Sequence, residues 1–441
     1  MPKCFEVMHM GEELLQIQGG NRLHGEIAVQ GAKNSALPLA AAAVLCSGET
    51  VLHHVPRLTD IWAACRILNR LGCRCRVEGG TVTVQNDGLT AAAIPDEDMR
   101  KMRSSIMFLG PVLGKAGECI LTMPGGCELG PRPIDMHLSA MRKMGAQITE
   151  TGGRIRCTAA RLRGARIPLE YPSVGVTENV ITAAALADGE TVLTNAAREP
   201  EIVDLARFLN QCGARIEGAG EGTVSVSGVE KLQGTEYTVM PDRIAAATWL
   251  CAGAATGGTV CVSGVCPQDL ESVLAVLEAA GCRLGISGSR IYLDAGGSLH
   301  GVRYIRTMPF PGFPTDAQAP VSAMLATAAG ISVIEETVFE SRYKHIGELL
   351  RMGADIRVSG RTAVINGVKK LHGAEITAAD LRGGAALCIA ALGAEGTSLV
   401  RGVCHIDRGY ENLHDVFNSL GGAVRRLPDS SASGEKSARE G

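Results

Sequence analysis

The chain has 441 residues, of which 46% are hydrophobic and 20% charged, so it has the apolar content for several buried cores and is not a disordered chain. Its formal net charge is −3, which excludes an overall basic surface for duplex nucleic acid. Aromatic residues make up only 3%, too few for the stacking platforms that bind single strands. We therefore expect no nucleic-acid partner, and any anionic ligand requires a local cluster of cations.

The N-terminal segment 1–18 lacks the pattern of a signal peptide, because acidic residues interrupt it. No later run approaches the ~20 apolar residues that cross a membrane. The 15 cysteines contain no CxxC pair, and those at 73, 75, 261 and 266 lack zinc spacing. The sequence thus predicts a cytoplasmic protein with reduced thiols, no membrane association and no metal.

The first 70 or so residues after position 26 predict one compact unit of order β-α-β-α-β-β. Its first helix is rich in alanine and is expected to end at Gly48, whereas its second helix is amphipathic and is expected to end at Gly72. Gly79-Gly80 predicts a hairpin between the last two strands. The expected elements are strands at 26–29, 50–53, 74–77 and 81–84 and helices at 35–46 and 58–71.

A short motif of apolar residue, glycine, small residue, polar residue and apolar residue recurs six times, at intervals of 68 to 73 residues. Its glycines are Gly72, Gly145, Gly213, Gly281, Gly353 and Gly421. One such unit cannot enclose its own helices, but three units packed together can share a buried helical core with sheets outside. We therefore predict an α/β (α+β) fold with two inside-out, barrel-like domains of three repeats each.

The expected domain bounds follow from the repeat. Residues 33–240 hold repeats 1–3 and carry a lid loop at 122–134, which is dense in glycine and proline. Residues 241–426 hold repeats 4–6, and residues 1–32 join them because they supply a leading strand. Residues 427–441 are polar and small, and predict a disordered tail.

Equivalent loops of the six units carry charged side chains, so two facing domains would bring them to one cleft. Helix N-termini at the same ends have unpaired N–H groups that favour anions. Such a cleft would hold a polyanionic substrate, and the alternative is that these groups form surface caps and salt bridges. The cations concerned are Lys33, Arg103, Arg132, Arg382 and Arg408.

Two proline-rich segments are unusual. In the segment 124–133, Cys127 lies close to Arg132, and a neighbouring cation lowers the pKa of a thiol. Cys127 is therefore predicted to be a proton donor or nucleophile, with an ordinary loop cysteine as the alternative. The segment 309–316 ends at Asp316, which either caps the following helix or accepts a proton from a substrate hydroxyl.

Taken together, these motifs resemble those of the UDP-N-acetylglucosamine 1-carboxyvinyltransferases, enolpyruvyl transferases with the EPSP synthase-like fold. The resemblance extends over about residues 15–426 and implies two domains that close over the substrates. The segments that carry it are GAKNSALP at 31–38, PGGC at 124–127, RPID at 132–135, REPEIVD at 198–204, PTD at 314–316, ETVFE at 336–340, DLR at 380–382 and HIDRGYE at 405–411.

The resemblance implies transfer of the enolpyruvyl group of phosphoenolpyruvate to the 3′-hydroxyl of UDP-N-acetylglucosamine with release of phosphate, the first committed step of peptidoglycan synthesis. Lys33, Arg132 and Arg408 would grip phosphoenolpyruvate. Cys127 would be a general acid that fosfomycin alkylates, and Asp316 would take the hydroxyl proton. No cofactor is implied. The other substrate-binding positions implied are Asn34, Arg103, Ser173, Val174, Gly175, Asp242, Val338, Asp380 and Arg382.

Two other functions stay open. A relative that transfers enolpyruvyl to shikimate 3-phosphate shares the fold but lacks the PGGC lid. A catalytically silent paralogue would bind the sugar nucleotide and regulate, although intact Lys33, Cys127 and Asp316 favour an enzyme. Pro172 stands where some members have a lysine near the nucleotide, and the sequence leaves a homo-oligomer open.

Overall fold

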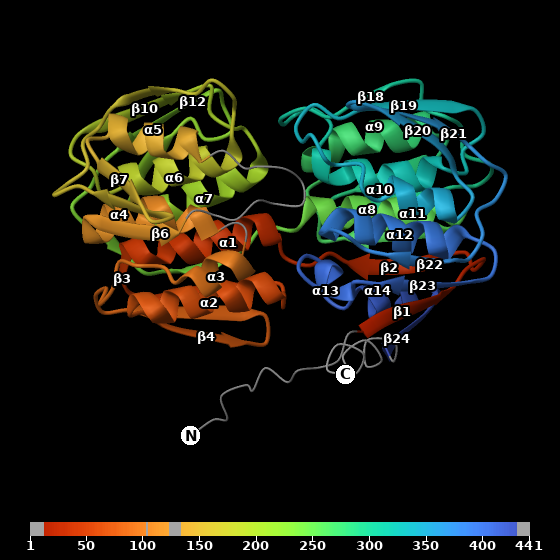
Figure 1. Ribbon diagram of the computed structural model, residues 1–441, viewed down its shortest axis with the longest axis horizontal. Helices are drawn as coiled ribbons and strands as arrows, with labels where there is room; N and C mark the ends of the chain where they lie inside the picture. The colour runs from red at the N-terminus through yellow and green to blue at the C-terminus, as the bar shows by residue number, and fades with distance from the viewer. Residues whose placement is uncertain (1–12, 103–104, 123–133, 430–441) are drawn as a thin grey trace.

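The computed structural model describes residues 13–102, 105–122 and 134–429, with the side chains of residues 100 and 101 left out. Two lobes lie side by side, each with its own hydrophobic core (Figure 1). The core residues of the first lobe lie between Ala36 and Val239. Those of the second lobe lie between Leu15 and Val29 and between Ala245 and Val424.

The first lobe repeats the order helix, strand, helix and two further strands three times. A short leading strand precedes the helices of the third repeat, and two more strands close the lobe. Its elements are α1 (Lys33–Ala42), β3 (Cys46–His53), α2 (Thr59–Leu71), β4 (Arg74–Glu78), β5 (Thr81–Asn86), α3 (Asp96–Lys101), α4 (Leu109–Ala116), β6 (Glu118–Thr122), α5 (Asp135–Lys143), β7 (Gln147–Thr151), β8 (Arg154–Thr158), β9 (Arg166–Pro168), α6 (Val174–Ala184), β10 (Glu190–Thr194), α7 (Pro200–Gln211), β11 (Arg215–Glu217), β12 (Thr223–Ser227), β13 (Leu232–Gln233) and β14 (Glu236–Thr238).

In the second lobe the first two repeats follow the same order, whereas only one strand follows the helices of the last repeat. The lobe also contains the first two strands of the chain. Its elements are β1 (Glu13–Gln18), β2 (His24–Ala28), α8 (Arg243–Ala255), β15 (Thr259–Ser263), α9 (Glu271–Ala279), β16 (Arg283–Ser287), β17 (Arg290–Asp294), β18 (Ile305–Arg306), α10 (Thr315–Leu325), β19 (Ile331–Glu335), α11 (Ile346–Arg351), β20 (Asp355–Ser359), β21 (Thr362–Asn366), β22 (Glu375–Thr377), α12 (Leu381–Gly393), β23 (Thr397–Arg401), α13 (Val403–Ile406), α14 (Leu413–Ser419) and β24 (Ala423–Pro428).

The helices α1, α8 and α12 are buried along nearly their whole length, which explains why their sequences are rich in alanine and lack a continuous polar face. In the second lobe α8, α10 and α12 pack against one another, and sheets cover them from outside (Figure 1). The predicted inside-out α/β fold is therefore confirmed. The six sheets stay separate within the described ranges, so each lobe resembles a barrel without being closed by strand pairing.

Two details differ from the sequence expectation. The helix α1 ends at Ala42, a 3₁₀ turn covers Ala43–Leu45, and Gly48 lies inside β3 with φ +82°. The prediction that Gly48 ends the helix is therefore wrong, because β3 starts early enough for Cys46 to pair with Leu232. At the other end β24 runs to Pro428, beyond the expected limit at 426, because it pairs along the whole of β1.

The lobes exchange their leading strands. β2 leads into α1 but pairs in parallel with β15 of the second lobe, whereas β14 leads into α8 but pairs with β3 of the first lobe. The chain thus crosses between the lobes twice, and the two crossing segments lie side by side. The Ala32 N–H donates to the Met240 carbonyl at 2.7 Å, and the Asp242 N–H donates to the Gln30 carbonyl at 2.9 Å. The first residues after both crossings, Lys33 and Asp242, are therefore neighbours.

No helix within the described ranges is both long enough and apolar enough to cross a membrane.

Candidate active site

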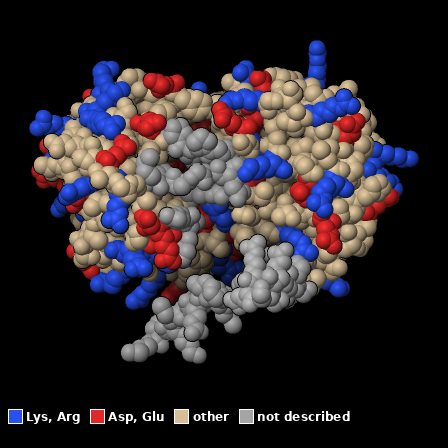
Figure 2. Space-filling view, viewed as in Figure 1, with Lys and Arg blue, Asp and Glu red and all other residues tan. Residues whose placement is uncertain are grey.

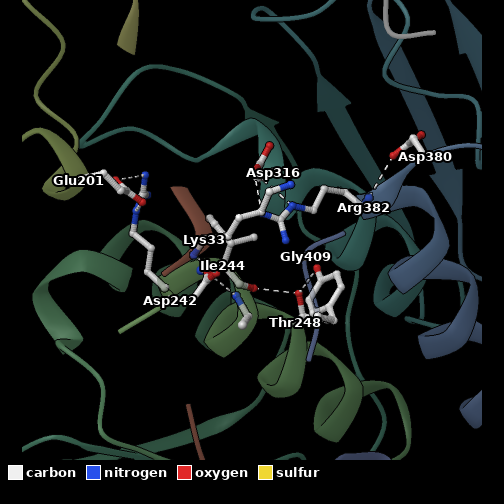
Figure 3. A network of polar contacts seen from close by, with 12 residues as sticks. Lys33, Glu201, Asp242, Ile244, Thr248, Asp316, Asp380, Arg382 and Gly409 are labelled. Atoms are coloured by element: carbon white, nitrogen blue, oxygen red, sulfur yellow. Dashed lines mark hydrogen bonds and ion pairs between the residues drawn. The ribbon is translucent and has the colours of Figure 1, made fainter. Parts of the chain in front are cut away.

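The helix α1 begins where the chain crosses into the first lobe, and α8 begins where it crosses back into the second lobe. A hydrogen bond joins the starts of these two helices. Asp242 caps α8, since its carboxylate accepts the N–H groups of Ile244 and Ala245, each at 2.9 Å. The same carboxylate accepts the Lys33 N–H at 3.3 Å, at the start of α1 (Figure 3). Burial raises the pKa of Asp242. The predicted site residues Lys33 and Asp242 are thus brought together.

A carboxylate that the sequence did not indicate joins a cation from each lobe. Asp60, in the first turn of α2, lies 2.7 Å from the Lys33 Nζ. Its two oxygens also accept Nε and Nη2 of Arg408 at 3.0 and 3.1 Å, and Arg408 belongs to the second lobe. Burial lowers the pKa of Lys33 more than Asp60 raises it, whereas Lys33 and Arg408 overcome burial and lower the pKa of Asp60.

Asp316 lies at the centre of a second ion-pair cluster. It stands in the first turn of α10, and its Oδ1 accepts Nη2 of Arg342 at 2.6 Å. Its Oδ2 accepts Nε and Nη2 of Arg382 at 3.1 and 3.0 Å (Figure 3). Although burial opposes it, these two guanidinium groups hold the pKa of Asp316 well below its usual range. Asp316 is therefore a firmly ionised carboxylate in this arrangement.

Arg382 is fixed by its own helix terminus. Asp380 caps α12, and its carboxylate accepts the N–H groups of Arg382 and Gly383 at 3.0 and 2.9 Å. The Arg382 guanidinium lies over the Tyr410 ring, 5.3 Å from its centroid, and the Tyr410 hydroxyl lies 2.9 Å from the Thr248 hydroxyl. These contacts hold the guanidinium in place before any ligand binds.

The two arginines that bind Asp316, Arg382 and Arg342, each have one donor atom that makes no hydrogen bond within the described residues. Arg382 and Arg342 are 3% and 4% exposed, yet Nη1 of Arg382 and Nε of Arg342 have no hydrogen-bond partner among the described residues. Buried N–H groups without a partner are costly, and guanidinium donors match carboxylate and phosphate oxygens. The cluster can therefore accept an anion at these two atoms.

Two further contacts join the lobes beside this site. Arg243 of α8 donates from Nε and Nη2 to Glu201 of α7 at 3.0 and 3.2 Å. The Phe310 N–H donates to Glu199 at 3.3 Å, and burial raises the pKa of Glu199. On the face seen in Figure 2, acidic and basic side chains are interspersed over both lobes, and basic side chains are visible in the hollow between them.

The structure also describes five other residues that the sequence predicted for the site. Ser173 caps α6, and Val174 and Gly175 form its first turn. Val338 follows β19, and its N–H donates to Glu336 at 2.8 Å. Asn34 is exposed in the first turn of α1. Among the residues described, no hydrogen bond joins these five residues to the two ion-pair clusters.

Three predicted residues, Arg103, Cys127 and Arg132, lie outside the described residues. Of the cysteines examined for metal binding, burial raises the pKa of Cys73 to about 11 and also raises that of Cys261. Within the ranges that the structure describes, no three His, Cys, Asp or Glu side chains are grouped to hold a metal ion.

Comparison with known proteins identifies the family of the chain. A model of the protein family described as EPSP synthase (3-phosphoshikimate 1-carboxyvinyltransferase) matches residues 17–417. The UDP-N-acetylglucosamine 1-carboxyvinyltransferase 2 of Caldanaerobacter subterraneus is 48% identical over 412 residues, which cover 93% of this chain and 99% of that protein. The UDP-N-acetylglucosamine 1-carboxyvinyltransferase of Nitratidesulfovibrio vulgaris is 46% identical over 417 residues, covering 94% and 99%.

Two solved structures of related enzymes have the same fold as this chain. The enolpyruvyl transferase NikO from Streptomyces tendae has a TM-score of 0.86 at 26% identity and covers 95% of this chain and 100% of its own. An EPSP synthase from Acinetobacter baumannii shares the fold, with a TM-score of 0.72 at 21% identity and coverage of 94% and 99%. The resemblance seen in the sequence is thus confirmed, and the chain belongs to the EPSP synthase family, among the UDP-N-acetylglucosamine 1-carboxyvinyltransferases.

Proposed function

We propose that the protein transfers the enolpyruvyl group of phosphoenolpyruvate to the 3′-hydroxyl of UDP-N-acetylglucosamine and releases phosphate, as the first committed step of peptidoglycan synthesis. The observation that carries this function is the cluster of cations from both lobes around Asp316 and Asp60. Both substrates are polyanions, and a site with several fixed guanidinium groups suits them. The names of the relatives supply the acceptor.

The chemistry is an addition followed by an elimination. The 3′-oxygen forms a bond to C2 of phosphoenolpyruvate, its proton leaves to a base, and C3 receives a proton from an acid. The resulting tetrahedral carbon then expels phosphate from C2, and C3 loses a proton to restore the double bond. Lys33, Arg408 and Arg132 would hold the carboxylate and phosphate, which pre-organises charge for both steps. Cys127 would deliver the proton to C3.

Asp316 can act as the base only when the charge of its two arginine partners is offset. In the present arrangement the pKa of Asp316 is held far too low for it to take a hydroxyl proton readily. The free donors of Arg382 and Arg342 can bind substrate anions, and the negative charge of those anions offsets the two cations beside Asp316. The pKa of Asp316 then rises, so that substrate binding itself produces the base.

The other proposed roles are those that the family resemblance implies. Ser173, Val174 and Gly175 form the N-terminus of α6 and would bind the sugar nucleotide there, and Val338 would be a further contact of the nucleotide. Arg103 would bind the same substrate, and Asn34, Asp242 and Asp380 would line the reacting centre. The 13 described cysteines form no disulfide with one another, which suits the proposed cytoplasmic location.

The test is the choice of acceptor. Phosphate release from phosphoenolpyruvate is measured with UDP-N-acetylglucosamine and, separately, with shikimate 3-phosphate. We expect release only with the sugar nucleotide. Release only with shikimate 3-phosphate would overturn the substrate, and release with neither would favour a silent sugar-nucleotide-binding protein.

A further inference from the structure

Glu336, directly after β19, is a fully buried carboxylate that takes part in no ion pair among the described residues. Its oxygens instead accept four hydrogen bonds from neutral donors. Oε1 accepts the Thr307 hydroxyl at 2.9 Å and the N–H groups of Val338 and Phe339 at 2.8 and 3.0 Å. Oε2 accepts the Thr315 hydroxyl at 2.9 Å. A buried carboxylate whose oxygens are this fully engaged holds its partners in fixed places.

These bonds tie together three separate segments of the second lobe. Thr307 follows β18, Thr315 is the first residue of α10, and residues 338 and 339 form the loop after β19. The Thr337 N–H donates to the Thr307 hydroxyl at 2.8 Å, which closes the cluster. Glu336 therefore sets the start of α10 relative to the loop that carries Val338.

Glu336 is connected to Asp316 through two sets of contacts. Thr315 precedes Asp316 in the chain, so its bond to Glu336 fixes the backbone that carries the Asp316 side chain. The Phe339 ring lies 5.4 Å from the Arg342 guanidinium carbon, and Arg342 in turn lies 2.6 Å from Asp316. The carboxylate thus positions Asp316 through its main chain and through its cationic partner.

We propose that Glu336 is a positioning residue that couples the nucleotide side of the site, at Val338, to the base Asp316. Its effect depends on the positions of its two oxygens, which accept these hydrogen bonds, and not on its charge. This role rests on the function proposed above. It predicts that binding of the sugar nucleotide and proton transfer from its hydroxyl depend on the same buried side chain.

The test distinguishes the effect of the length of the Glu336 side chain from the effect of its charge. In Glu336→Gln the amide oxygen can accept the bonds now made to Oε1, and the amide nitrogen can donate to the Thr315 hydroxyl, so most of kcat is retained. Glu336→Asp keeps the charge but is one methylene shorter and cannot reach both Thr315 and the 338–339 N–H groups. We expect its kcat to fall about tenfold or more, and its KM for UDP-N-acetylglucosamine to rise.

Two further variants keep the test independent of simple destabilisation. Thr315→Val removes only the link to α10 and should lower kcat while the KM for the sugar nucleotide stays unchanged. Ser332→Ala removes a buried hydroxyl of β19 that accepts the Val302 N–H at 2.9 Å, away from Glu336, and should lower Tm without changing either constant.

The outcomes are distinct. Titration of UDP-N-acetylglucosamine by calorimetry should show weaker binding for Glu336→Asp than for Glu336→Gln. Equal activity of these two variants, or better activity of Glu336→Asp, would overturn the positioning role while wild-type turnover leaves the proposed function intact. A wild-type protein that neither binds nor uses UDP-N-acetylglucosamine would overturn both.

Discussion

Replacing Asp60 with asparagine is expected to shift the alkaline limb of the pH profile to lower pH. The Lys33 ammonium lies 2.7 Å from Asp60, and the pKa of Lys33 is already lowered by burial, against which Asp60 acts. An opposite charge at this range changes a pKa by roughly one to three units, so its loss lowers the pKa of Lys33 by a similar amount. That corresponds to about 1.4–4 kcal/mol.

The sign follows from the role proposed for Lys33. Phosphoenolpyruvate is an anion, so the protonated lysine binds it, and activity is lost as pH rises through the pKa of Lys33. Asp60→Asn keeps the size of the side chain and also leaves Arg408 without its counterion, which disfavours a second positive charge on Lys33. The limb should therefore appear at lower pH, with kcat/KM falling about tenfold per pH unit above it.

The assay is kcat/KM for phosphoenolpyruvate over the neutral and alkaline range. Asp98→Asn is the matched control, because Asp98 is also a buried carboxylate of the first lobe and lies 3.5 Å from Arg66. It should reduce stability without moving the limb. An alkaline limb that stays in place or moves to higher pH in Asp60→Asn would refute the reasoning.

Three other predictions use separate parts of the molecule. Asp316→Asn should lower kcat by about 10²–10⁴-fold while UDP-N-acetylglucosamine still binds in calorimetry, since it removes the proton acceptor; unchanged kcat would exclude Asp316 as the base. Fosfomycin should add to the wild-type protein but not to Cys127→Ser in intact-mass spectra; an adduct on the variant would place the reactive group elsewhere. Burial lowers the pKa of His137 from 6.5 to about 4, and its Nδ1 accepts from Asn179 at 2.9 Å, so the unfolded chain binds an extra proton between these values. The free energy of unfolding should therefore fall as the pH is lowered from about 6.5 to about 4, by up to about 3 kcal/mol from this group. In urea titrations His137→Asn should flatten that slope and the exposed His24→Asn should not; an unchanged slope in His137→Asn would contradict the assignment.

The repeat made the fold predictable from the sequence, because glycines at the ends of equivalent elements mark a fixed period. Gly72 ends α2 in the left-handed conformation with φ +103°, as expected. Gly48 has a similar φ of +82° but lies within a strand. A positive φ serves either place equally, and only the pairing of β3 with β13 decides between them. The bounds 33–240 and 241–426 stay a prediction.

The site was only partly predictable. Caps such as Asp242 and Asp380 are short polar residues before apolar helices, and such residues can be recognised in a sequence. Asp60 appears as an ordinary acid in the first turn of α2, and its role depends on Arg408, which lies 348 residues away in the chain. Glu336 belongs to a motif that identified the family, but its four hydrogen bonds join segments whose proximity only the fold establishes.

The central claim is tested most directly by the product of a single reaction. Phosphoenolpyruvate and UDP-N-acetylglucosamine are mixed with an excess of the protein, and phosphate and the sugar nucleotide are followed by phosphorus and proton NMR. The account predicts equal amounts of free phosphate and of a sugar nucleotide that carries the enolpyruvyl group on its 3′-oxygen. Phosphate without that ether, or unchanged substrates after prolonged incubation, would contradict it.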